Sequence, residues 1–199
     1  MRGICVLTLL IALPAIAAPT VPRDQITMVP EAWRGQWAPY DEAVQTAKEA
    51  LADAERTATA ANAELDRADA ALGRAKDMEK QAAKAHKAAR KAKDPARSKA
   101  AAANKATALS DLSDAGRRHA KATSDRDLAQ ANVDLCEAKV SWAQARREQV
   151  VAQAVSDAGG WAEMVRFDGA LAEAAEAVKT AEARLETAKA QAVLTAQGR

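Results

Sequence analysis

Nine lysine and arginine side chains lie between Lys80 and Lys105, and the only acid among them is Asp94. The whole chain is nearly neutral, with 29 Lys and Arg against 27 Asp and Glu, so this segment is unusual in carrying almost only positive charge. Clustered cations attract phosphate and carboxylate groups. The sequence therefore predicts an anion-contacting surface, here called the basic tip, made of Lys80, Lys84, Lys87, Arg90, Lys91, Lys93, Arg97, Lys99 and Lys105.

The alternative role of these cations is solubility, because an alanine-rich helix needs charge outside its packed face. A solubilising face normally mixes both signs, as the rest of this chain does. Both interpretations stay open from the sequence alone.

Residues suited to catalysis are sparse. Neither His86 nor His119 has an acid or a second histidine at i±3 or i±4, which is the spacing of helix-borne metal ligands. Cys136 has no histidine within a helical turn, and the sequence has no glycine-rich phosphate loop. We expect a non-enzyme with no catalytic residues, no metal site and no cofactor.

The N-terminus has the layout of a secretory signal peptide over residues 1–17. Arg2 precedes an apolar run, and small residues then lead to a cleavage site after Ala17. We expect a periplasmic or secreted protein that does not span a membrane after cleavage. Cys136 is then the only cysteine, so internal disulfides cannot stabilise the chain.

Residues 18–38 are interrupted by prolines, and we interpret them as a linker with one helical turn at Pro30–Trp33. Residues 39–197 form an elongated helical coiled-coil domain. Apolar residues recur there with a spacing of three and four and form the packed seam of each helix. Within this seam, alanine alternates with larger apolar residues. The breaks at Asp94-Pro95 and Gly159-Gly160 divide the domain into helices over about 39–93, 96–157 and 161–196.

The second helix carries a further apolar row, so it needs two neighbours. This row is Leu128, Ala131, Leu135, Ala138, Trp142 and Ala145. The predicted fold is all-α: a long antiparallel helical hairpin, a coiled coil with an alanine-rich seam, and a shorter third helix packed on its base. The first two helices should extend beyond the third as an arm of roughly 40 Å, with the basic tip at its end.

Placing the turn at Asp94-Pro95 also predicts three pairs across the hairpin. They are Arg126 with Glu64, Arg147 with Glu42, and His119 with Asp69.

Most aromatic residues should meet at the base, where Met164 joins them. We favour a hydrophobic plug that closes the bundle, and a docking patch for a partner is the alternative. The residues concerned are Trp33, Trp37, Tyr40, Trp161 and Phe167.

These features favour an exported, non-enzymatic coiled-coil structural or interaction protein whose basic tip contacts an anionic envelope component. Its partner would be an anionic envelope polymer, a lipid surface or an acidic protein, and the chain could also form a homo-oligomer. The exported location and the lack of aromatic residues at the tip argue against nucleic acid.

Exported helices with a basic hairpin tip resemble the tentacles of Skp-type periplasmic chaperones, which would imply a holdase function. That family also has a strand-built trimerisation body, and this sequence has no alternating β pattern. The helical hairpins of efflux adaptor proteins are a weaker resemblance, since their flanking β domains are missing. A passive spacer or a phage-type lysis component is the third alternative, in which only length matters.

Overall fold

The structure is a computed structural model that describes residues 19–198. About 90% of these residues are helical and none lies in a strand, which confirms the all-α prediction. The predicted signal peptide, residues 1–17, lies outside the described residues. None of the described helices is both long and apolar enough to cross a membrane.

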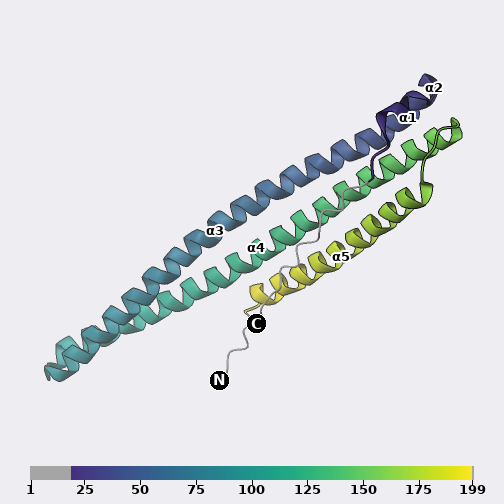
Figure 1. The fold of residues 1–199 in the computed structure, drawn as a ribbon. Helices are drawn as coiled ribbons and strands as arrows, with labels where there is room; N and C mark the ends of the chain where they lie inside the picture. The colour runs from purple at the N-terminus through teal and green to yellow at the C-terminus, as the bar shows by residue number, and fades with distance from the viewer. Residues whose placement is uncertain (1–18, 199) are drawn as a thin grey trace. The chain divides into compact units, whose positions relative to one another are not determined.

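Three long helices follow a short helical N-terminal segment (Figure 1). In chain order the elements are α1 (Arg23–Thr27), α2 (Glu31–Arg34), the 3-10 helix η1 (Gly35–Trp37), α3 (Ala38–Lys91), α4 (Pro95–Asp157) and α5 (Met164–Ala196). The first long helix packs against the second, and the shorter α5 packs on them. The predicted hairpin with a third helix is therefore confirmed.

The chain divides into two compact units, each with its own core. The aromatic unit comprises Met1–Val44 and Ser141–Ala175, and the alanine unit comprises Gln45–Val140 and Glu176–Arg199. All four tryptophans, Trp33, Trp37, Trp142 and Trp161, belong to the aromatic unit. Tryptophan fluorescence therefore reports on that unit alone.

Small side chains form the core of the alanine unit. Between α3 and α4, Ala54 and Ala58 pack with Ala129 and Val133, and Cys136 lies half-buried beside them. Between α4 and α5, the buried residues are Ala131, Leu135, Ala138, Ala181 and Leu185. This second cluster contains part of the predicted second apolar row of α4, whereas Trp142 of that row is 43% exposed.

The first turn joins α3 to α4 at the predicted position. Helix α3 ends at Lys91, two residues before the predicted end, because Lys93 adopts a left-handed backbone conformation with φ 55°. The Asp94 carboxylate accepts a hydrogen bond of 3.1 Å from the Arg97 N–H and so caps α4. Pro95 is the first residue of α4, where its missing N–H removes no helical hydrogen bond.

The second turn depends on two glycines with different functions. Helix α4 ends at Asp157, and Gly159 follows with φ 83°, a conformation that favours glycine. A Cβ atom on Gly160 would lie 2.6 Å from Val155 Cγ1, which is closer than packed atoms allow. Helix α5 begins at Met164 and not at the predicted Trp161, and the Trp161 N–H in the connecting segment donates to Gln25 Oε1 at 3.3 Å.

We expect the substitution Gly160→Ala to lower the free energy of unfolding of the aromatic unit by about 1–3 kcal/mol, the usual cost of overpacking a core. Urea denaturation followed by tryptophan fluorescence measures the change. Gly169→Ala is the matched control, since Gly169 lies in α5 of the same unit with open space around it. That control should stabilise the unit by up to about 1 kcal/mol through helix propensity. Equal effects of the two substitutions would contradict the packing argument.

The segment interpreted as a linker is a packed part of the aromatic unit. Val21 and Val29 are buried with Trp37, and the Arg34 side chain donates to the carbonyl oxygens of Val29 and Thr27 at 3.1 and 3.2 Å. The helical turn predicted after Pro30 is present as α2, and the structure adds α1. Burial of the two valines explains why this proline-interrupted segment is ordered.

The three predicted cross-hairpin pairs have different outcomes. His119 Nε2 lies 2.8 Å from Asp69 Oδ1, as predicted. Arg147 pairs with Asp41 at 2.6 Å instead of the neighbouring Glu42. The Arg126 prediction is wrong, because Arg126 pairs with the adjacent Asp127 and Glu64 pairs with Arg67 one turn away. Acids on the same helix were closer partners than the acid across the seam.

Candidate functional site

The basic tip surrounds the turn between α3 and α4, within the alanine unit (Figure 1). Eight of its nine cationic side chains are exposed, and Lys105 is half-buried in the seam. Lys80 lies 3.6 Å from Asp77, an exposed pair of the kind that contributes little. Within residues 19–198, the other eight cations form no ion pair.

Seven of the thirteen lysines and arginines described elsewhere in the alanine unit form an ion pair with an acid. Five exposed ones each pair with an acid three residues away on the same helix, and they are Arg56 with Asp53, Arg67 with Glu64, Arg117 with Asp114, Lys179 with Glu176 and Lys189 with Glu186. The hydrogen bond from Lys179 to Glu176 raises the pKa of Lys179. In the basic tip one cation of nine has such a partner, so pairing is less frequent there than in the rest of the unit.

The only acid of the tip is already engaged by the backbone. Asp94 accepts the Arg97 N–H as the cap of α4, so its carboxylate is committed to the helix end. The first turn of α4 contains no acid, and Arg97 lies in it. A cation at the positive end of a helix dipole is unfavourable by about 0.3–1 kcal/mol. Helix stability therefore does not explain this cation.

The tip offers charge without apolar surface. Buried positions near the turn are alanines, namely Ala75, Ala89 and Ala108, and His86 is half-buried in the same seam. No aromatic or large aliphatic residue occurs from Lys80 to Lys105. At about 25 cal/mol per Å² such a seam contributes little stability, so binding here would be electrostatic.

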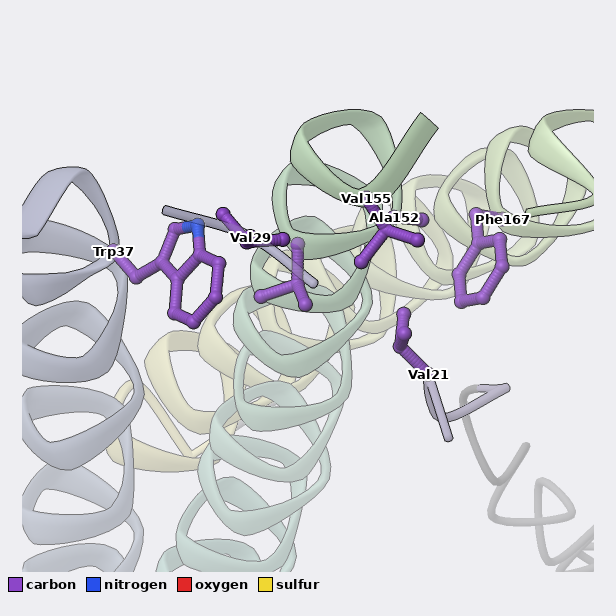
Figure 2. Close-up of a cluster of buried hydrophobic side chains, with 7 residues drawn as sticks. Val21, Val29, Trp37, Ala152, Val155 and Phe167 are labelled. Atoms are coloured by element: carbon purple, nitrogen blue, oxygen red, sulfur yellow. The ribbon is translucent and has the colours of Figure 1, made fainter. Parts of the chain in front are cut away.

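The predicted aromatic group is only partly a hydrophobic plug. Trp37 and Phe167 are buried with Val21, Val29, Val151, Ala152 and Val155, and Met164 packs against them (Figure 2). In Figure 2, Trp37 comes from η1, directly before α3, Ala152 and Val155 come from α4, and Phe167 comes from α5. Tyr40 is half-buried, with the Arg146 guanidinium 6.0 Å from its ring centre.

The other two aromatic residues of the predicted patch face solvent. Trp33 is 39% exposed and Trp161 is 73% exposed. Sequence analysis missed two exposed apolar residues in the same unit, Met28 and Val165, because the exposure of a single apolar residue cannot be recognised from sequence periodicity.

The histidines and the cysteine do not form a catalytic or metal-binding group. His119 pairs with Asp69, His86 lies in the seam near the tip, and Cys136 packs between α3 and α4. Among the residues that the structure describes, no three His, Cys, Asp or Glu side chains are placed to hold a metal ion.

Glu148 is a buried residue that sequence analysis did not identify. It is 9% exposed, its Oε2 accepts the Val21 N–H at 3.1 Å, and its other oxygen pairs with Arg147. The hydrogen bond to Asp41 raises the pKa of Arg147, which therefore stays protonated. In the sequence, Glu148 sits between Arg147 and Gln149 and looks like part of a solvated face.

Comparison of the chain with protein-family models, with curated proteins and with solved structures found no match.

Proposed function

We propose that this chain is an exported, non-enzymatic coiled-coil interaction protein whose basic tip binds an anionic component of the cell envelope. One observation carries the proposal: nine cations gather around the turn with a single acid, and eight of them have no ion-pair partner in the described chain, whereas seven of the thirteen lysines and arginines elsewhere in the same unit are paired with acids. Export rests on the signal-peptide pattern of residues 1–17.

A purely solubilising role explains this arrangement less well. Solubility requires charge, but it does not require charge of one sign, and mixed signs serve it equally. Elsewhere in the alanine unit acids are interspersed with the cations and pair with about half of them, whereas the segment around the turn has nine cations and one acid. Arg97 also lies where the helix dipole disfavours it.

The test is co-sedimentation of the protein with purified cell-wall sacculi and with lipopolysaccharide at low and high salt. A variant with Lys84, Lys87, Arg90, Lys91 and Lys93 all changed to Gln should bind at least about tenfold more weakly at low salt. Binding of the unaltered protein should decline steeply as salt increases.

The matched control removes the same number of positive charges elsewhere. It changes Arg56, Arg67, Arg117, Lys179 and Lys189 to Gln, all of them exposed cations with acid partners. Binding by this control should stay within about threefold of the unaltered protein, because these cations are already neutralised. Unchanged binding by the tip variant would refute the proposal.

Two alternative functions give different results in related assays. A holdase would suppress aggregation of an unfolded outer-membrane protein. A passive spacer would keep its function after neutralisation of the tip and lose it when equal lengths of α3 and α4 are removed.

A further inference from the structure

Four of the tip lysines form a single row along α3. Lys80, Lys84, Lys87 and Lys91 are spaced i, i+4, i+7 and i+11, the spacing of residues on one helix face. All four side chains are exposed. The row extends over about 16 Å at 1.5 Å per residue.

This row lies on the side of α3 that faces away from α4. Lys80, Lys84 and Lys87 each precede a seam residue by two positions, and those seam residues are Ala82, His86 and Ala89. Ala89 is buried and the other two are half-buried, so they define the face toward α4. Two residues correspond to about 200° around the helix, which places the lysines nearly opposite the seam.

The next row around α3 is uncharged. Gln81, Ala85, Ala88 and Ala92 follow the four lysines by one position each, and all are exposed. The cations are therefore not spread evenly around the helix. The remaining tip cations are Arg90 on the flank of α3 and a second group of four at the turn and on α4, namely Lys93, Arg97, Lys99 and Lys105.

We propose that the lysine row is the principal contact and that its ligand is a linear polyanion lying lengthwise along α3. This inference rests on the proposed function and specifies its ligand class. A row of lysines separated by about 4.5–6 Å matches a chain with repeated phosphate or carboxylate groups. Lysine binds such groups as a point charge without demanding the bidentate geometry of arginine.

Other ligand classes fit the row less well. A partner helix needs an apolar seam, and the residues beside the lysines are only alanine and glutamine. Single-stranded nucleic acid uses aromatic stacking, which this segment cannot supply. It also has no large apolar side chain to insert into a lipid surface.

The experiment compares two variants of the full mature chain that each lose four charges. The row variant is K80Q/K84Q/K87Q/K91Q, and the turn variant is K93Q/R97Q/K99Q/K105Q. Glutamine keeps the helix propensity of lysine and arginine, and far-UV circular dichroism verifies the folding of both. The probes are inorganic polyphosphate of graded chain length and vesicles with and without anionic lipid.

We expect the row variant to bind long polyphosphate about 100-fold more weakly at low salt, and the turn variant less than about tenfold more weakly. The slope of log affinity against log salt should decrease by about 3 for the row variant. Affinity should increase with chain length until the polyphosphate spans about 16 Å.

Each other outcome overturns a defined part of the argument. If both variants lost the same affinity, the lysine row would not be the principal contact. The proposed function would still stand, because the total positive charge of the tip would then determine binding. Binding to anionic vesicles but not to polyphosphate would assign the surface to lipid and refute the linear ligand. Unchanged binding by both variants to every probe would refute the proposed function as well.

Discussion

Replacing Phe167 with alanine is expected to lower the free energy of unfolding of the aromatic unit by about 3–4 kcal/mol. Phe167 is 6% exposed and packs in one cluster with Val21, Val29 and Trp37. Its removal would leave a cavity bounded by helices that cannot fully collapse onto one another. The cluster also joins the N-terminal segment to α4 and α5, so the loss is not confined to one pair of helices (Figure 2).

Tryptophan fluorescence measures this unfolding, since all four tryptophans belong to the aromatic unit. Val165→Ala is the control, because Val165 is only two residues away in α5 and is 86% exposed. The control should change the free energy by less than about 0.5 kcal/mol. If Phe167→Ala cost no more than this control, Phe167 would not be a core residue.

Replacing Glu148 with alanine is expected to destabilise the aromatic unit by about 2–4 kcal/mol and to release the segment before α2. The Val21 N–H would lose its acceptor in a buried site, which costs about 1–3 kcal/mol. The Glu148 side chain would also leave a small void, and Arg147 would lose one of its two acid partners.

Hydrogen exchange separates the two parts of this prediction. The Val21 amide should exchange much faster in Glu148→Ala, whereas the amides in the middle of α4 should exchange at nearly the same rate. Glu148→Gln is the control, since glutamine retains an oxygen acceptor for the Val21 N–H and should preserve most of its protection. Slow exchange at Val21 in both variants would show that Glu148 does not anchor this segment.

Sequence patterns predicted the fold because it depends on local signals. The alanine seam repeats with a helical period, Asp94-Pro95 cannot continue a helix, and Gly159 allows the backbone conformation that ends α4. The second apolar row on α4 predicted a third helix, and Leu135 of that row is buried against α5. The composition of the basic tip was also visible, since nine cations with one acid need no structure to be counted.

Tertiary structure alone decided the properties that depend on which side chains meet. Whether Arg147 pairs with Asp41 or with Glu42 depends on the register between α3 and α4. The hydrophobic repeat of the sequence does not define this register to within one residue. Burial separated Trp37 and Phe167 from the exposed Trp33 and Trp161, although all four are equally apolar in sequence.

Glu148 shows most clearly that burial and hydrogen-bond partners cannot be recognised from the sequence alone. A glutamate beside an arginine on a long helix has the pattern of a solvated surface, and only the folding of Val21 onto α4 turns it into a buried acceptor. Sequence determined the helices, their turns and the charge at the tip, because propensity, chain breakers and composition act locally. Tertiary structure decided burial and partner choice, because these depend on residues distant in the chain.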